Sequence, residues 1–235
     1  MAYAPQIPFD FSVAEAPGFD NFVVGDNGEA IARLSDWSQT LQVGGSPTAC
    51  VIWGGSSVGK SHLLRAAVQR AASAAIPTLW IDASATFPPD PFVSARMLAV
   101  DDADRLSSAQ QAWLFTAFNH VAQQGGLTLA SGQLPPARWP MRDDIRSRLA
   151  SGLAFELLPI PHNALPDMLA DYTVKRGFRI SNEALTYLLN HSERDVSSLC
   201  KALSGIDRYS LAAKRAVTVP LVREYLSDTG RQGSV

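Results

Sequence analysis

The sequence predicts a parallel α/β domain followed by a small domain made of helices alone. Short apolar segments alternate with helical ones as far as residue 158, and a glycine-rich loop joins the first strand to a helix. From residue 162 to 228 the pattern is helical, with almost no strand signal. Alternating strands and helices are typical of a parallel sheet, and the later helices indicate a separate lid. We therefore expect an extended arm over residues 1–18, an α/β domain over 19–160 and a helical lid over 161–235.

The individual elements follow from local patterns. The arm contains three prolines, which exclude a helix there. Ile31, Leu34, Trp37 and Leu41 recur at helical spacing and predict a helix within residues 28–42. Proline-rich residues 85–94 and 135–140 predict loops. The expected strands are residues 49–53, 79–82, 97–102, 127–131 and 155–158, and the other helices of the first domain are 60–75, 107–124 and 142–150.

Composition limits the class of protein. Apolar residues make up 46% and charged residues 18% of 235 residues, which is typical of a globular protein with a core. The formal net charge of −2 provides no general attraction to nucleic acid. Cys50 and Cys200, far apart in apolar surroundings, favour a reducing compartment. No signal peptide or membrane-spanning stretch is evident, so we expect a cytoplasmic protein without a membrane partner.

One segment matches the phosphate-binding P-loop pattern G-x-x-x-x-G-K-[ST]. Its glycines allow the backbone to curl so that successive N–H groups face phosphate oxygens, and the following helix adds positive charge at its N-terminus. Lys60 is expected to reach the terminal phosphates and Ser61 to join a Mg²⁺ shell. A strand before the loop and a helix after it argue against a chance glycine turn. The predicted site for ADP or ATP consists of Gly54, Gly55, Ser56, Ser57, Val58, Gly59, Lys60, Ser61 and the adjoining His62.

Polar residues end the next strands. Asp101 and Asp102 close an apolar strand about 40 residues after the P-loop, where a Walker-B site requires an acidic pair. Asp101 would hold Mg²⁺ through water, and Asp102 would orient an attacking water. Ser131 ends the following strand, where it either contacts the terminal phosphate or the attacking water, or is simply a small residue at a strand end.

Two further features allow more than one interpretation. Arg142, Arg146 and Arg148 form either a solvated helix face paired with neighbouring aspartates or a source of an arginine finger, because the guanidinium fork suits phosphate oxygens. In the arm, a glutamine precedes apolar residues at alternate positions. Such a segment docks into a partner's groove or folds onto its own domain. Its residues are Gln6, Ile7, Phe9 and Phe11.

Taken in order, these segments resemble the AAA+ ATPase module of the DnaA family. The resemblance rests on Phe19-Asp-Asn-Phe22, the P-loop, the Asp101-Asp102 strand, Ser131 and Ser147-Arg-Leu-Ala-Ser-Gly152, and it covers nearly the whole chain. Within the family, the sequence is most similar to the short Hda regulators. It ends after the lid, without a helix-turn-helix domain, and its arm resembles their sliding-clamp motif. Segments starting at Gln133 and Ile206 also look like theirs.

The resemblance implies a mechanism. Hda proteins hold ADP, bind the DNA-loaded β sliding clamp and drive hydrolysis of ATP on the initiator DnaA, which represses re-initiation of replication. Arg148 matches the family's arginine finger, which acts on the partner's nucleotide. The clamp motif matches Gln6, Ile7, Phe9 and Phe11, whereas Phe22 and Gly25 match the adenine-lining segment. The resemblance implies no sequence-specific DNA binding of its own and allows self-association.

One position departs from the family pattern. The lid arginine called sensor II aligns with Ser197, while Arg194 lies close by as a substitute. A missing sensor II implies weak or no turnover by this chain, although the intact P-loop leaves hydrolysis open. Two alternatives therefore remain: a helicase-loader-type AAA+ ATPase that acts by its own turnover, and a nucleotide-sensing scaffold.

Overall fold

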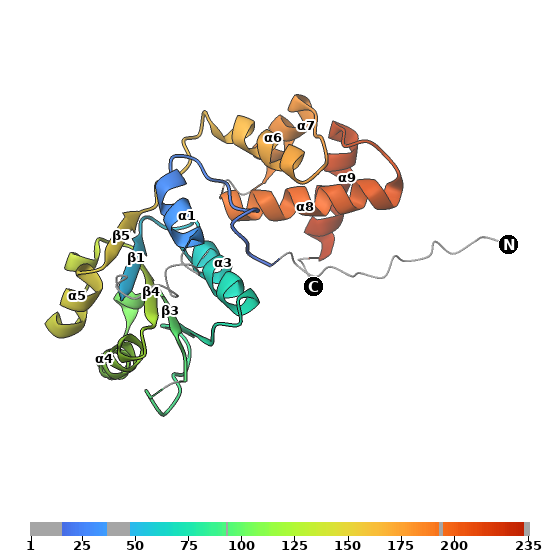
Figure 1. The fold of residues 1–235 in the computed structure, drawn as a ribbon. Coiled ribbons are helices and arrows are strands. Elements are labelled where there is room, and N and C mark those ends of the chain that lie inside the picture. Colours follow the sequence, from blue (N-terminus) through green and yellow to red (C-terminus); the bar gives the residue numbers. More distant parts are fainter. Residues whose placement is uncertain (1–15, 37–47, 93, 193–194, 233–235) are drawn as a thin grey trace. The chain divides into compact units, whose positions relative to one another are not determined.

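The structure is a computed structural model that describes residues 16–36, 48–92, 94–192 and 195–232. The chain divides into an α/β unit over Pro17–Ile160 and a helical unit that begins at Pro161. Figure 1 shows the fold along the chain, with the strands in the first of these units.

The α/β unit is built on one five-stranded sheet with the order β2-β3-β4-β1-β5. Every neighbouring pair of strands is parallel, as expected when each strand is joined to the next by a crossing connection. The strands are β1 (Ala49–Trp53), β2 (Thr78–Asp82), β3 (Met97–Asp101), β4 (Leu127–Gly132) and β5 (Leu153–Glu156).

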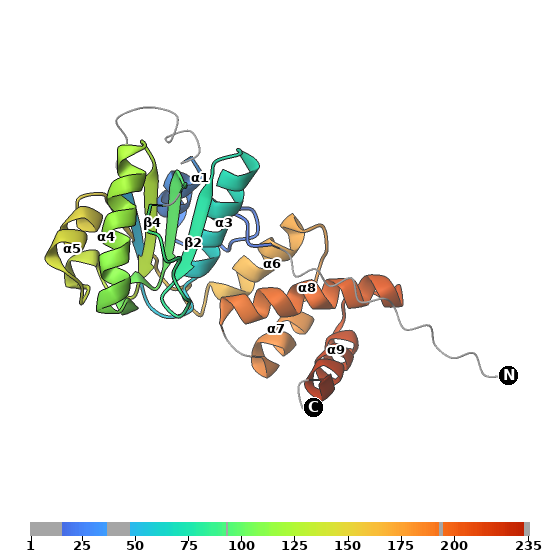
Figure 2. The ribbon, with the colours of Figure 1, turned by 90° about the horizontal axis from the view of Figure 1, so that it is seen from below.

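Helices cover both faces of the sheet (Figure 2). Cys50 and Ile52 of β1 face one buried cluster, which α1 and α3 complete, whereas Val51 faces the cluster formed with α4 and α5. Burial on both faces explains why the strands are continuous apolar runs and do not alternate with polar residues. The helices are α1 (Gly28–Ser35), α3 (Lys60–Ser73), α4 (Ser108–Gln123) and α5 (Asp143–Ala150), with short 3₁₀ turns η1 (Ala103–Arg105) and η2 (Pro136–Arg138).

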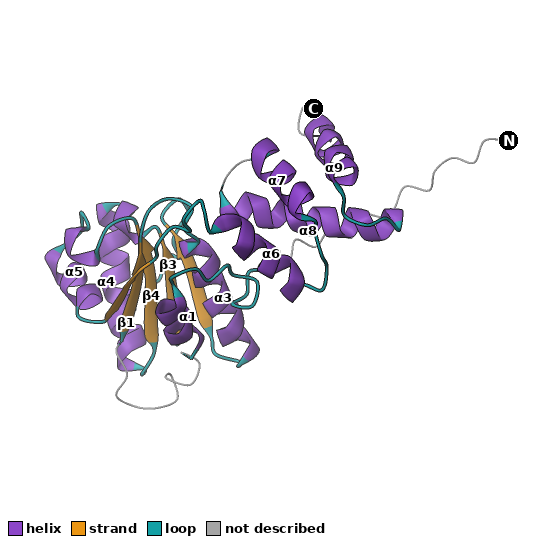
Figure 3. Cartoon of the chain, turned by 90° about the horizontal axis from the view of Figure 1, so that it is seen from above, coloured by secondary structure: helices purple, strands orange, loops and turns teal. Residues whose placement is uncertain are grey.

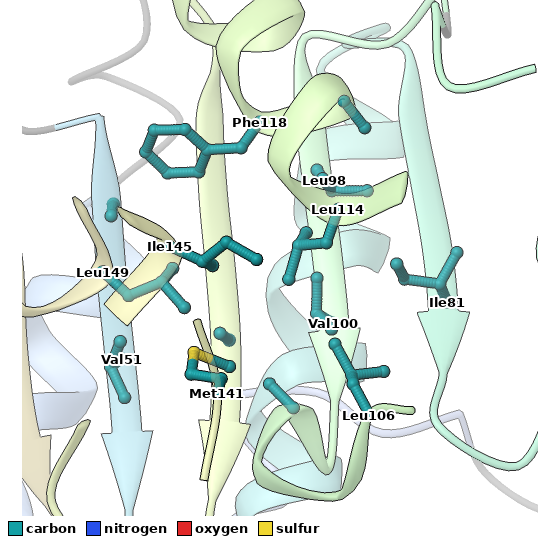
Figure 4. Packing of buried hydrophobic residues seen from close by; sticks show 14 of the residues in the cluster. Val51, Ile81, Leu98, Val100, Leu106, Leu114, Phe118, Met141, Ile145 and Leu149 are labelled. Carbon is teal, nitrogen blue, oxygen red and sulfur yellow. The ribbon is translucent and has the colours of Figure 1, made fainter. Parts of the chain in front are cut away.

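The core beneath α4 and α5 fixes these two helices on the sheet. Leu114 of α4 and Ile145 and Leu149 of α5 are almost completely buried against Val51 and Val100 of the strands (Figure 4). Ser107 caps the start of α4 in a reciprocal capping box with Gln110, which satisfies two backbone N–H groups at that end.

The second unit contains helices and no strand among its described residues (Figure 3). Its helices are α6 (Leu165–Lys175), α7 (Asn182–His191), α8 (Val196–Ala213) and α9 (Val219–Gln232). Ser181 and Asp195 cap the starts of α7 and α8 by accepting hydrogen bonds from backbone N–H groups. The expected fold class, a parallel α/β unit followed by helices, is therefore confirmed.

None of the described helices is both long and apolar enough to cross a membrane.

Most boundaries differ from the sequence prediction by one or two residues, as those of β5 do. β5 begins at Leu153 and ends at Glu156, two residues earlier than expected, because Leu153 pairs with Cys50. The backbone of Leu158 turns away from the sheet to accept from and donate to the side chain of Asn27. α1 ends at Ser35, and residues 37–42 of the expected helix, with Trp37 and Leu41, lie outside the described residues.

The burial of the first cysteine gives a testable prediction. Cys50 is 1% exposed, and burial raises the pKa of its thiol to about 12. At pH 8 the thiolate fraction is then about 10⁻⁴, so iodoacetamide should leave Cys50 unmodified in the native chain and modify it after denaturation. Peptide mass spectrometry after a timed pulse measures this. Rapid labelling of Cys50 without unfolding would contradict the position of β1 inside the sheet.

Candidate functional site

The glycine-rich loop after β1 has the backbone that a P-loop requires. Gly59 has φ +99°, and Ser57 has φ +60°, so the chain turns sharply before α3. At Gly54, a Cβ atom would lie 2.5 Å from the carbonyl oxygen of Leu157, and nothing larger than hydrogen fits there. The first N–H groups of α3 have no partners within the helix, so they are available to an anion held by the loop.

Lys60, the first residue of α3, is folded into this loop. Its Nζ donates hydrogen bonds to the carbonyl oxygens of Gly54 at 2.9 Å and Gly55 at 2.7 Å, and the residue is buried. Burial lowers the pKa of Lys60, while the carboxylates at the end of β3, first of all Asp102, favour the ammonium form. A cation is thus held inside the turn where phosphate oxygens are expected.

A hydrogen-bonded cluster joins the ends of β3 and β4. The Ser131 hydroxyl donates to Oδ1 of Asp101 at 2.5 Å and accepts from the backbone N–H of Asp102 at 3.0 Å. Asp101 and Ser131 are both buried, whereas Asp102 is partly exposed and has a left-handed backbone with φ +50°. The two carboxylates therefore have different environments. The Asp101 carboxylate is held by the Ser131 hydroxyl, whereas Asp102 is partly exposed to solvent.

Further acidic residues follow Asp101 in the turn after β3. Burial and then the neighbouring Asp101 raise the pKa of Asp102, while Arg105, 3.6 Å from its carboxylate, acts in the opposite direction. Asp104 accepts a hydrogen bond from the backbone N–H of Gln133 at 2.8 Å. The turns after β3 and β4 are therefore tied together at two points, through Ser131 and through Asp104.

The segment before α1 lies against the P-loop. The ring of Phe22 occupies the space next to Gly59, where a Cβ atom would lie 2.5 Å from its Cε2. The His62 ring is 5.4 Å from the Phe22 ring, and its Nε2 lies 2.9 Å from the carbonyl oxygen of Gly18. Gly25 has φ +53° in the turn that leads into α1. Phe22 and His62 are thus brought to the same side of the P-loop, and Gly25 lies in the turn that follows Phe22.

The three arginines of α5 and its start have different partners. Arg142 pairs with Asp144 at 2.7 Å, and Arg146 pairs with Asp143, as the solvated-face interpretation expects. The contacts of Arg148 are instead with neutral groups. Its Nε donates to Oδ1 of Asn119 at 3.1 Å, and its Nη1 donates to the backbone carbonyl of Asp144 at 2.8 Å.

The Arg148 guanidinium also lies over the ring of Phe115, with its Cζ atom 4.7 Å from the centroid of the ring. The Arg142 guanidinium lies 5.4 Å from the same centroid. Such cation–π contacts restrict a long side chain without neutralising its charge. Arg148 is therefore an oriented cation, held by Phe115 and Asn119 of α4.

Arg148 and the P-loop lie at opposite edges of the sheet. The P-loop leaves the carboxyl end of β1, whereas a Cβ on Gly152, just after α5, would lie 2.1 Å from the carbonyl of Ala49 at the start of β1. Four residue steps of about 3.3 Å each along β1 separate the two edges by about 13 Å. The end of α5 that follows Arg148 thus lies at the opposite end of β1 from the nucleotide loop, while the guanidinium itself reaches back to the carbonyl of Asp144.

Some expected site residues are not described. Gln6, Ile7, Phe9 and Phe11 of the arm, and Arg194 near the sensor II position, lie outside the described residues. Ser197, the other sensor II position, is the second residue of α8 in the helical unit.

Four residues that contribute to this geometry were not singled out from the sequence. Asn27 is buried and its amide bonds both ways to the backbone of Leu158, beside the P-loop floor. Asp104 holds the turn after β4, and Phe115 and Asn119 hold Arg148. The acidic run at residues 101–104 offered a weak signal for Asp104, but the others lie far along the chain from the groups they contact.

The described residues do not form a metal site by themselves. No group of three or more His, Cys, Asp or Glu side chains among them is arranged to hold a metal ion. A single buried carboxylate next to a serine hydroxyl suits Mg²⁺, which typically takes one or two protein ligands together with phosphate oxygens and waters.

Comparison with known proteins agrees with this architecture. A family model described as the Hda lid domain matches residues 165–226. Domain III of the Thermotoga maritima replication initiation protein DnaA is similar, with a TM-score of 0.65 and 19% identity over 90% of this chain and 95% of that one.

Two further solved structures show the same fold. DnaA from Aquifex aeolicus, solved with AMPPCP bound, gives a TM-score of 0.66 and 20% identity over 81% of this chain and 65% of that chain. A RuvB variant from Thermotoga maritima gives 0.60 and 13% identity, over 90% of this chain and 72% of that one.

The α/β unit and the helical unit together have the AAA+ fold seen in these DnaA structures. Within the helical unit, residues 165–226 match the Hda lid domain.

The Ser131 cluster gives a testable prediction for stability. Ser131→Ala leaves the buried Asp101 carboxylate without its donor and the Asp102 N–H without its acceptor. We expect the free energy of unfolding to fall by about 1–3 kcal/mol, measured by urea denaturation. Ser61→Ala, at an exposed hydroxyl, is the matched control and should stay within about 0.5 kcal/mol. An unchanged stability for Ser131→Ala would mean that this cluster does not hold the strand ends together.

Proposed function

We propose that the site after β1 binds ADP or ATP with Mg²⁺. The N–H groups of the loop and Lys60 would hold the phosphates, and Ser61 and Asp101 would hold the ion. The support is the turn that only glycine fits at Gly54, the buried ammonium of Lys60 and the carboxylate fixed by Ser131. AMPPCP, which is bound to the DnaA of similar fold, makes an adenine nucleotide the first choice of ligand.

The bound nucleotide serves regulation. In this proposal the chain, together with the DNA-loaded sliding clamp, stimulates hydrolysis of ATP on the initiator DnaA and so represses re-initiation of replication. Arg148 inserts into the nucleotide site of the initiator, where an arginine finger stabilises the charge of the transition state. The chain itself has weak or no turnover, and it acts in the cytoplasm without sequence-specific contacts to DNA.

The observation that carries this proposal is the position of Arg148. Its hydrogen bonds go to an amide and a backbone carbonyl and not to a carboxylate, and Asn119 and Phe115 orient it on the helix that returns to the start of β1. This placement supports a role of Arg148 at a nucleotide bound to another molecule. Self-association, which the AAA+ fold allows, would offer the same face to a second copy.

The sliding clamp would supply the second contact. Gln6, Ile7, Phe9 and Phe11 would dock into its groove as an extended peptide with alternate apolar anchors. Two linked weak contacts raise the effective concentration of the arginine near the initiator, so neither contact has to be strong alone.

The arginine proposal is tested by Arg148→Ala. Loss of a finger removes about 10³-fold or more of the partner's rate, so stimulation of ATP hydrolysis on the initiator should vanish in a phosphate-release assay with loaded clamp. Nucleotide binding should be unchanged, because the P-loop is at the other edge of the sheet. Arg146→Ala, on the same helix but paired with Asp143, is the control and should retain stimulation. Stimulation that persists in Arg148→Ala would exclude Arg148 as the finger.

The clamp proposal is tested by the double variant Gln6→Ala with Phe9→Ala. It should lose binding to the purified β clamp, measured by surface plasmon resonance, and keep the circular dichroism of the parent. Ser12→Ala in the same arm is the control and should bind normally. If the double variant binds the clamp as the parent does, the arm is not the docking segment.

A second function is favoured by the intact hydrolytic residues. Asp102, partly exposed beyond the fixed Asp101, could orient a water, as in a helicase-loader-type ATPase that works by its own turnover. Measurable turnover that Lys60→Ala abolishes, with no clamp binding, would select this function. A nucleotide-sensing scaffold would show neither turnover nor any effect on the initiator.

A further inference from the structure

His62 lies directly after the P-loop serine but its ring is directed to another part of the chain. Its Nε2 is 2.9 Å from the carbonyl oxygen of Gly18, and since a carbonyl only accepts, Nε2 is the donor. Burial lowers the pKa of His62, while the Gly18 carbonyl and Asp20 act in the opposite direction. The hydrogen bond therefore places a proton on Nε2.

Two more contacts fix the same segment on α3. The Phe22 ring rests on the backbone of Gly59, within 2.5 Å of where a Cβ would be, and packs beside His62. Two turns further along α3, the Arg70 guanidinium lies 4.9 Å from the centroid of the Phe19 ring. The helix that begins with the phosphate loop thus carries residues 18–22 on its side.

This arrangement determines what a ligand in the loop would meet. The glycines at the two ends of the loop have different neighbours: Gly54 touches the carbonyl of Leu157, and Gly59 touches Phe22. When phosphates occupy the loop, the remainder of the ligand must extend past one of these neighbours. Phe22 offers an aromatic face, whereas Leu157 offers a backbone carbonyl already close to Gly54.

We propose that His62 is a positioning residue which, through its hydrogen bond to Gly18, holds residues 18–25 as the wall for the nucleoside part of the ligand. His62 then contributes to affinity for a whole nucleotide and not to affinity for phosphate alone. The inference rests on the proposed nucleotide binding. In this proposal the P-loop holds the phosphates, and residues 18–25 form the wall. The ordered conformation of this wall depends on the hydrogen bond from Nε2 of His62.

A substitution at His62 should affect the wall of residues 18–25 but not the phosphate-binding loop. Without the ring, the carbonyl of Gly18 loses its donor and Phe22 loses a packing neighbour, so a ligand would have to order the wall as it binds. A ligand that consists of phosphates alone does not reach the wall and is unaffected. His62→Gln should restore the function, because its side-chain amide can donate to the same carbonyl.

The experiment is titration calorimetry with Mg²⁺-ADP and with Mg²⁺-pyrophosphate. His62→Ala should weaken ADP about 10-fold, the effect of losing one hydrogen bond with its packing, and change pyrophosphate affinity less than about 2-fold. His62→Gln should recover most of the ADP affinity. Lys60→Ala should weaken both ligands, and His120→Ala, a half-buried histidine on α4, should weaken neither.

A second measurement does not depend on ligand affinity. Hydrogen exchange of the peptide covering residues 18–25 should be faster in His62→Ala than in the parent, with α4 unchanged, which also reports whether the variant is folded. Equal losses for ADP and pyrophosphate would overturn the inference, since His62 would then act on the loop. So would an ADP affinity unchanged by His62→Ala. If the parent protein binds neither ADP nor pyrophosphate, the proposed nucleotide site is wrong, and the role of His62 that rests on it is excluded as well.

Discussion

The parallel register of β1 between β4 and β5 is the constraint on which the site depends. Ile52 is beside Ser131 and Trp53 is beside Gly132, so β1 and β4 end at the same level. The P-loop leaves the sheet at that level, and Ser131 makes its hydrogen bonds to the end of β3 there. A shift of one residue would turn Ser131 to the opposite face of the sheet and break its bond with Asp101.

The same register places two groups of candidate site residues at opposite ends of the strands. The carboxyl edge of the sheet collects the phosphate loop and the acidic residues, as parallel α/β folds do. Crossing helices must return to the amino edge before the next strand begins, and α5 carries Arg148 there. The length of β1 therefore lies between the end of α5 and the phosphate loop of the same chain. This follows from the connectivity alone.

The sequence was sufficient to predict those features that depend on residues close together in the chain. The P-loop spacing, the acidic end of β3 and the switch to helices after residue 160 predicted the fold class, which is confirmed. Local patterns were insufficient where distant segments meet. Asn119 and Phe115 lie about 30 residues before Arg148, and nothing in their own surroundings indicates an arginine partner. β5 was placed two residues late because its limits are set by pairing with β1, not by its apolar residues.

The partners of Arg148 explain why one of three neighbouring arginines is suited to act on a phosphate. A guanidinium in an ion pair must give up its carboxylate before it serves another anion, and that carboxylate would then repel the incoming charge. Asp144 and Asp143 impose this cost on Arg142 and Arg146. Asn119 and Phe115 orient Arg148 and leave its full positive charge available, so little reorganisation is needed when a phosphate arrives. An oriented and uncompensated cation is the physical requirement for a finger, and of the three arginines Arg148 is the one whose hydrogen bonds and ring contact meet it.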